Sequence, residues 1–300
     1  MRFSVVGIEY QLGEIEIDLL RDHPEYASVL TKTGMPRHYQ SELPLHELAA
    51  KAASKLLSTH TSEAAQIGAL LLVTQSSEFH LPSTSALVHA ALGLAPEVMA
   101  IDLNQGCSGF VQALCIAVPL TASHGNVLIV CADRYRAKLR TGDRSTESIF
   151  SDAASAVLVG RDGPLTLGFQ SHHTEGSGAR LLQQRTGETL TMAGAEVFLW
   201  TRNRVVKQIL RALDTEITLG HRIRTAVLHQ ASKLVVETIQ STLPTGTEVP
   251  TNFETVGNTV SSSIPILLAQ ESAILKRSGS TLLSGFGVGL SSSVVVIRHG

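Results

Sequence analysis

The chain repeats one order of strands, turns and helices in its two halves, and this repetition constrains the fold of the 300 residues more than any other feature. In the first half, an expected strand LLLVTQ leads to the helix STSALVHAALGL, the strand VMAIDL, the turn NQGCSG, the helix FVQALCIAV and the strand NVLIVCAD. In the second half, TAVLHQ leads to SKLVVETIQSTL, VPTNFE, the turn TVGNTVSS, the helix IPILLAQESAIL and the strand STLLSGF. A duplicated βαβαβ unit explains this order and places Cys107 and Asn258 in equivalent turns.

The alternation of short apolar runs with Ala-rich segments is typical of strands that helices cover on both faces. We therefore predict an α/β protein with two similar halves, residues 1–163 and 164–300. The stretch 163–200 interrupts the repetition, and we expect a loop-rich excursion there that lines a site. Helices are expected near residues 44–58, 83–93, 108–122, 194–213, 232–241 and 263–276.

Composition excludes several classes of function. Hydrophobic residues make up 43% and charged residues 17% of the chain, which favours a globular protein whose surface is partly buried in an oligomer. A net charge of -2 gives no basic footprint for nucleic acid. No apolar run approaches the roughly 18 residues of a membrane span, and the N-terminus lacks a signal-peptide pattern. We expect a soluble, cytoplasmic protein.

Cys107 lies where an expected strand ends and a helix begins, in the sequence DLNQGCSGF. A thiol at a helix N-terminus faces free N–H groups, which lower its pKa from about 8.5 toward neutrality. Gly106 and Gly109 allow the backbone and a ligand to approach closely. A cysteine among apolar residues is more often buried and inert, and that interpretation fits Cys115 and Cys131. Three cysteines without CxxC spacing also argue against a disulfide framework and a zinc site.

Three further motifs follow along the chain: HQAS with His229 at a strand end, GNTVSSSIP with Asn258 after a glycine, and the Gly-rich turn GFGVGL. Taken singly, each has an ordinary interpretation. A histidine can be a core residue, an asparagine after glycine is common turn chemistry, and a GxG pair that does not open a helix is weak evidence for nucleotide binding.

Together, GCSGF, HQAS, GNTVSSSIP and GFGVGL resemble, in order and spacing, the signatures of the ketosynthase III family of the thiolase superfamily. The resemblance covers nearly the whole chain. It implies the thiolase fold, five αβαβα layers built from two pseudo-twofold halves, and a homodimer. It implies no cofactor or metal, with acyl-coenzyme A or acyl-carrier-protein thioesters as substrates.

The resemblance also implies a condensing mechanism. Cys107 matches the nucleophile that carries the acyl group, and the N–H groups of Cys107 and Val288 match the oxyanion donors. His229 and Asn258 match the residues that stabilise the enolate formed when a malonyl thioester on acyl carrier protein loses CO₂. This enolate attacks the Cys107 acyl group.

Departures from the family pattern bear on the substrate. Ser28 stands where the family has a Trp that stacks on coenzyme A, and Lys32, Ala195 and Leu234 replace other contact residues. Lost stacking and bidentate contacts weaken coenzyme A binding, which favours a donor on a carrier protein and a specialised fatty acid or polyketide-type pathway. Arg144 matches a nucleotide-phosphate contact. The further substrate-binding positions are Leu81, which would reach across the dimer into the acyl pocket, Met192, Phe286 and Gly287.

Arg204, Lys207 and Arg211 recur at helical spacing in WTRNRVVKQILRAL. They form either an ordinary solvated face or a docking patch for acidic acyl carrier protein. Two other functions stay open. The protein could transfer the Cys107 acyl group to an oxygen, nitrogen or sulfur nucleophile without condensation, or it could be the non-catalytic partner of a heterodimeric ketosynthase. The intact Cys, His and Asn set argues against the last.

Overall fold

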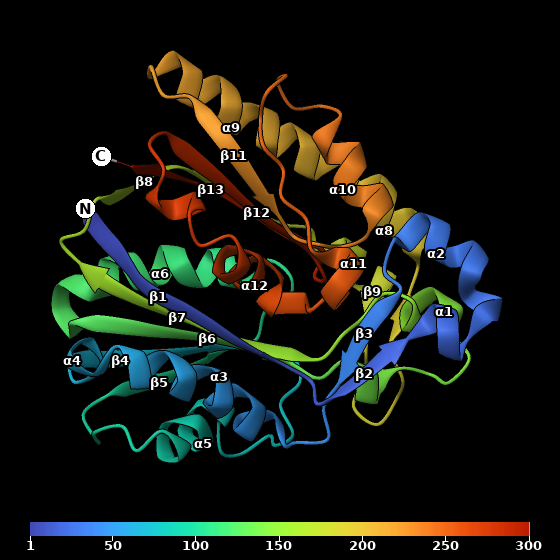
Figure 1. The fold of residues 1–300 in the computed structure, drawn as a ribbon, viewed down its shortest axis with the longest axis horizontal. Helices are drawn as coiled ribbons and strands as arrows, with labels where there is room; N and C mark the ends of the chain where they lie inside the picture. Colours follow the sequence, from blue (N-terminus) through green and yellow to red (C-terminus); the bar gives the residue numbers. More distant parts are fainter. Residues whose placement is uncertain (300) are drawn as a thin grey trace.

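A nine-stranded sheet runs through the computed structural model, which describes residues 1–299. Its strand order is β11-β12-β13-β8-β1-β7-β6-β4-β5 (Figure 1). The strands are β1 (Arg2–Leu12), β4 (Ile67–Val73), β5 (Met99–Leu103), β6 (Asn126–Asp133), β7 (Ala153–Arg161), β8 (Leu165–Thr174), β11 (Ile223–Leu228), β12 (Ser280–Gly287) and β13 (Ser291–His299).

The two halves share one strand topology. In the first, β5, β4 and β6 are parallel, and β7 and β1 complete the order by antiparallel pairing. In the second, β11 and β12 are parallel, and β13 and β8 follow antiparallel. The segment VPTNFE, which matches the strand VMAIDL in the repetition, forms no strand, and an isolated bridge between Thr225 and Glu248 lies just before it. The predicted repetition is thus visible in space, and the division at residue 163 stays a prediction that falls between β7 and β8.

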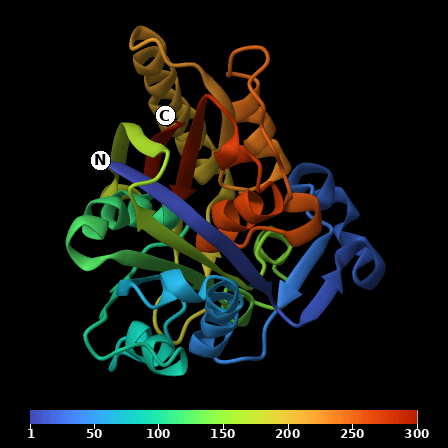
Figure 2. The same ribbon diagram turned by 60° about the vertical axis from the view of Figure 1, so that its left-hand side comes forward.

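Helices form three layers around this sheet (Figure 1; Figure 2). Two lie between the halves, two cover the outer face of the first half, and two cover the outer face of the second. The middle layer is α6 (Gly109–His124) and α12 (Ser263–Gln270). The outer layer of the first half is α3 (Leu45–Thr59) and α5 (Thr84–Ala91), and that of the second half is α9 (Val206–Thr218) and α10 (Lys233–Gln240). The two halves of the sheet are the two β layers between these three helix layers. This arrangement confirms the predicted α/β fold of five αβαβα layers.

The position of each helix follows from its apolar pattern. In α9, the buried apolar residues Val206, Ile209, Ala212 and Leu213 recur every three or four positions, so one stripe faces the sheet and the rest is free to be polar. In α12, residues 263–268 are all buried, which is why this helix lies in the middle layer. No helix within residues 1–299 combines the length and apolar character needed to cross a membrane.

The loop-rich excursion predicted for residues 163–200 is wrong in its first part. Leu165–Thr174 forms β8, which pairs with β13 along its length and with β1 at one end. Its sequence, LTLGFQSHHT, is too polar toward its end to resemble the other strands, yet its neighbours satisfy its backbone. A 3₁₀ turn (Gly176–Leu181) and the short pair β9 (Leu182–Gln183) and β10 (Thr191–Met192) follow.

The expected helix 194–213 is divided and runs further than predicted. It consists of α8 (Gly194–Trp200), a π-helical segment at Thr201–Val205 and α9, which continues to Thr218. The expected helix 263–276 is shorter, because α12 ends at Gln270 and only a 3₁₀ turn follows.

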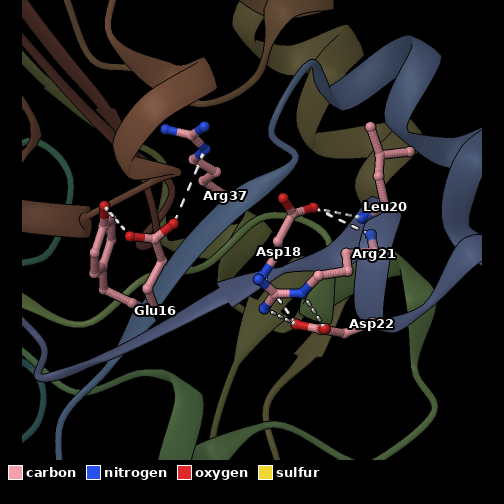
Figure 3. A network of polar contacts seen from close by, with 7 residues as sticks. Glu16, Asp18, Leu20, Arg21, Asp22 and Arg37 are labelled. Carbon is pink, nitrogen blue, oxygen red and sulfur yellow. Dashed lines mark hydrogen bonds and ion pairs between the residues drawn. The ribbon is translucent and has the colours of Figure 1, made fainter.

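A small unit between β1 and α3 was not predicted. It consists of β2 (Ile15–Asp18), α1 (Leu19–Asp22), α2 (Ala27–Thr33) and β3 (Arg37–Gln40). Three other short helices lie outside this unit: α4 (Thr61–Ala64), α7 (Arg144–Glu147) and α11 (Phe253–Val256). Figure 3 shows polar contacts of the small unit: the Asp18 carboxylate accepts the N–H groups of Leu20 and Arg21 and so begins α1, while Glu16 and Arg37 approach to 4.0 Å across β2 and β3.

The two chain ends lie side by side. Phe3 of β1 and His299 of β13 both stand in register with Leu165 of β8. Both ends therefore leave the same edge of the molecule, and α8, α10 and α2 lie at the other edge (Figure 1).

Candidate active site

One cavity of about 480 Å³ brings together residues from both halves of the chain. Cys107, His229 and Asn258 all line it, so the three side chains singled out by sequence converge. Four of the predicted substrate positions line the same cavity: Lys32, Met192, Phe286 and Gly287. Much of the remaining wall is apolar, with Phe150, Leu182, Val197 and Phe198 among its residues.

Cys107 occupies a tight turn between β5 and α6. A Cβ atom at Gly109 would lie 2.4 Å from Cγ1 of Val73, and one at Gly106 would lie 2.6 Å from Oε1 of Gln75, so side chains at either position would collide. The two glycines allow the turn to pack against the loop after β4. Cys107 is 5% exposed and lines the cavity.

Two backbone amides face the thiol. The N–H groups of Val288 and of Cys107 itself both hydrogen-bond toward Sγ, and they are the two groups that the family resemblance implies as oxyanion donors. Gly287 allows this approach, because a Cβ atom there would lie 3.0 Å from Sγ and its φ is +154°. The geometry resembles an oxyanion site, in which fixed N–H donors surround the position of developing negative charge.

The prediction that the pKa of Cys107 is lowered toward neutrality is wrong. Burial raises the pKa of this thiol to about 12, and the negative charge of Asp133 adds to the effect. The amides of Val288 and Cys107 act in the opposite direction but do not outweigh desolvation. The thiol is therefore protonated at neutral pH.

His229 follows β11 and is 1% exposed. Its ring meets Phe286 edge-on, with the centroids 5.5 Å apart. Burial lowers the pKa of His229 to about 3, so the imidazole is neutral at pH 7. Its Nδ1 is buried without a hydrogen-bond partner in the described part of the chain. A proton on Nδ1 would have no acceptor, which favours the tautomer with the proton on Nε2.

Hydrogen bonds hold the backbone of Asn258 and its side-chain oxygen, and they leave its side-chain Nδ2 group free to donate. Its Oδ1 accepts the N–H of Val260 at 2.9 Å. Its own N–H donates to the carbonyl of Ile149, and its carbonyl accepts the N–H of Ser151, both at 2.9 Å. Val260 has a φ of +52°, a conformation costly for a β-branched residue. These bonds fix Oδ1 away from the cavity and leave the Nδ2 N–H groups as donors.

Asp133 is a buried carboxylate that sequence reasoning missed. It ends β6, accepts the N–H of Gln75 at 2.9 Å, and accepts the hydroxyl of Ser261 at 2.5 Å. Burial raises its pKa to about 6. The residue connects the loop beside Cys107 to the segment after Asn258, and an acidic residue directly after the buried run NVLIVCA is the signal that could have identified it.

Other predicted positions lie outside this cavity. Leu81 is 87% exposed, and the Arg144 guanidinium lies over the Tyr26 ring at 5.6 Å, although its neighbour Ser145 lines the mouth. Arg204, Lys207 and Arg211 are all exposed. Ala195 and Leu234, two positions that depart from the family pattern, are exposed and line the mouth of the cavity. Residues 1–299 contain no group of three His, Cys, Asp or Glu side chains placed to hold a metal ion.

A five-layered fold with cysteine, histidine and asparagine converging on one cavity defines a thiolase-type condensing enzyme. Family models support this: that of 3-oxoacyl-(acyl-carrier-protein) synthase III matches residues 101–187, and that of its C-terminal part matches residues 216–299. The β-ketoacyl-(acyl-carrier-protein) synthase III of Streptococcus agalactiae is 30% identical over 290 residues, 90% of each chain. The chain belongs to the 3-oxoacyl-(acyl-carrier-protein) synthase III family and is a ketosynthase of the transferase class.

Solved structures agree with the assignment. The 3-oxoacyl-(acyl-carrier-protein) synthase III of Pseudomonas aeruginosa superimposes with a TM-score of 0.88 at 27% identity and covers 100% of this chain and 98% of its own. A priming β-ketosynthase from a polyketide biosynthetic pathway gives a TM-score of 0.87 at 25% identity, with 99% and 96% covered.

Proposed function

We propose that the protein loads an acyl group on Cys107 and condenses it with a malonyl-type thioester on acyl carrier protein, with loss of CO₂. The observation that carries this proposal is the convergence of Cys107, His229 and Asn258 on one cavity, with two backbone amides at the cysteine sulfur. The family assignment agrees with it.

In the first half-reaction, Sγ of Cys107 attacks the carbonyl carbon of the donor thioester. A new S–C bond forms, the bond to the donor thiol breaks, and that thiol leaves with the proton of Cys107. The N–H groups of Cys107 and Val288 hold the oxyanion, and losing one such donor typically costs about 10² to 10³ in rate. Because the thiol is protonated at rest, the proton must leave as the sulfur attacks.

In the second half-reaction, the malonyl carbon–carboxylate bond breaks and CO₂ leaves. The electron pair moves onto the thioester carbonyl oxygen, where Nε2–H of His229 and Nδ2–H of Asn258 donate to the enolate. The enolate carbon then attacks the acyl carbon, the C–S bond breaks, and the sulfur of Cys107 leaves as a thiolate. This thiolate takes up a proton from water, which restores the resting thiol. Two neutral donors suit this step, because they stabilise a charge that grows only in the transition state.

The mouth of the cavity favours a carrier-bound donor. Lys32, Ala195 and Leu234 line it and replace residues that the family uses to hold coenzyme A. Arg204, Lys207 and Arg211 are exposed and supply a docking patch for acidic carrier protein. Both features support a specialised fatty acid or polyketide-type pathway. The three free cysteines fit a reducing compartment, and the proposed location is the cytoplasm.

The sheet edge at β5 supports a homodimer. Ile101 on this strand is 41% exposed, and the loop before α5 exposes Phe79 and Leu81. Asp102 accepts the N–H groups of Thr84 and Ser85, which holds the end of that loop beside β5. An exposed strand edge with apolar neighbours is a ready pairing surface. In such a dimer, Leu81 would reach toward the acyl pocket of the second copy.

The experiment incubates the protein with a panel of acyl-coenzyme A and acyl-carrier thioesters and then adds malonyl-carrier protein. The proposal expects the mass of the acyl group on Cys107 and no such mass on Cys107→Ala. Addition of malonyl-carrier protein should then release CO₂ and remove the acyl group from the protein. Transfer to an added nucleophile without CO₂ would establish the plain acyltransferase instead. No acyl mass from any donor would establish a non-catalytic subunit.

A further inference from the structure

A second cavity, of about 330 Å³, adjoins the cavity that holds Cys107. Leu182 lines both, and Val288, whose N–H faces the Cys107 sulfur, lines the second. Polar side chains make up much of its wall, and none of them is acidic: Gln75, Asn104, Tyr135, Lys138, Gln183 and Gln184.

This polar wall begins next to the nucleophile. Tyr135 belongs to the same packed cluster as Cys107 and Leu182. The Tyr135 hydroxyl donates to Oε1 of Gln75 at 3.0 Å, and that oxygen lies 2.6 Å from the place of a Cβ atom on Gly106. Gln75 and Val288 therefore lie both beside the turn that holds Cys107 and on the wall of the second cavity.

The side chains offer donors more than acceptors. Because Oε1 of Gln75 accepts from Tyr135, the amide of Gln75 has its Nε2 N–H groups left to donate. Lys138 is half-buried, and its Nζ donates to the carbonyl of Gln75 at 2.7 Å, which leaves two further N–H groups. Tyr135 is engaged with Gln75, and Nε2 of Gln184 donates to two nearby carbonyls. Asn104 and Gln183 are exposed, so Gln75 and Lys138 are the half-buried donors of this wall.

Lys138 has no carboxylate partner. Within residues 1–299 it makes no ion pair, and burial lowers the pKa of its ammonium group. Asp133 acts on it only at longer range, and that carboxylate is occupied by Gln75 and Ser261. A partly desolvated cation without a counter-ion is costly unless a ligand supplies one.

We infer that the second cavity receives the far end of the acyl group and that this end carries a carboxylate, so that the donor is the half-thioester of a short dicarboxylic acid. The inference rests on the proposed acylation of Cys107. Lys138 and Gln75 bind the carboxylate, which takes no part in the thioester exchange. A purely apolar chain would remove water from Lys138 and give nothing in return.

The test compares two five-carbon donors, glutaryl and pentanoyl thioesters, by the kcat/KM of Cys107 acylation followed by intact-protein mass. A glutaryl group cannot lose CO₂ as a malonyl group does, so acylation alone is measured. We expect the wild type to favour glutaryl by about tenfold, the usual scale of a charge-assisted hydrogen bond. Lys138→Met should reverse this preference, and Lys138→Gln should bring it close to one.

Lys51, an exposed lysine of α3, provides the control, and Lys51→Met should keep the wild-type ratio. A wild-type preference for pentanoyl overturns the inference, as does an unchanged ratio in both Lys138 variants. If pentanoyl acylates Cys107 and glutaryl does not, this inference alone fails. If neither donor nor any other thioester acylates Cys107, the proposed function fails first.

Discussion

Gly287 comes so close to Cys107 that a methyl group on its α-carbon would lie 3.0 Å from the sulfur. No side chain fits there while the Val288 amide keeps its place at Sγ. The last residue of β12 thus determines whether the oxyanion donor can reach the reacting atom.

The first prediction concerns this contact. Gly287→Ala should lower the rate of Cys107 acylation by about 10² or more, because the Val288 amide must move away. Intact-protein mass after incubation with an acyl thioester measures the rate. Gly176→Ala is the control, since a Cβ atom there meets nothing within 4 Å. Equal rates in the two variants contradict the assignment of Val288 as a donor.

The second prediction separates the two half-reactions. Asn258→Asp keeps an oxygen for the Val260 N–H but places a negative charge where the enolate forms. Release of CO₂ from malonyl-carrier protein should fall by about 10² or more, while Cys107 acylation changes much less. A parallel loss of both steps would show that Asn258 serves the fold instead.

The third prediction concerns pH. Because burial raises the pKa of Cys107 to about 12, the thiolate fraction should rise tenfold per pH unit from pH 6 to 9 without reaching a plateau. The rate of iodoacetamide labelling of the Cys107 peptide, read by mass spectrometry, measures this. A plateau near pH 7 would restore the original expectation of an activated thiol.

The fourth prediction tests Asp133 as a positioning residue. Asp133→Asn removes a negative charge that raises the pKa of Cys107, so the labelling curve should shift to lower pH. The lost acceptor should cost about 1–3 kcal/mol of unfolding free energy. Asp214→Asn, at an exposed position of α9, should change neither quantity. A lower melting temperature with an unshifted curve would leave Asp133 a purely structural role.

The fifth prediction concerns the carrier protein. Charge reversal at Arg204 and Lys207 should raise the KM for carrier-bound thioesters several-fold and leave that for small thioesters unchanged, an effect that weakens with salt. Lys51→Glu, on α3, is the control for added negative charge. Equal effects on both substrate classes would remove the docking patch.

The order of strands, turns and helices in the sequence predicted the repeated halves, and the family resemblance of four motifs implied that Cys107, His229 and Asn258 meet. Sequence reasoning missed β8, since a polar strand such as LTLGFQSHHT is recognisable only by the partners that pair with it. It also misjudged the pKa of Cys107. The helix terminus can be read from sequence, whereas burial results from packing of both halves.

The second cavity was invisible in sequence for a related reason. Gln75 follows β4 and Lys138 follows β6, 63 residues apart, and only the parallel pairing of these strands brings them together. Nothing near either residue marks it as part of a site. Such clusters depend on topology, and they decide which substrate a shared catalytic set receives.

The two chain ends, paired on either side of Leu165, also have a practical consequence. Since both leave from the edge remote from α8 and α10, an affinity handle at either terminus leaves the entrance open to a bulky carrier protein. The enzyme can therefore be immobilised by either end on a sensor chip, and association of carrier proteins measured without obstruction.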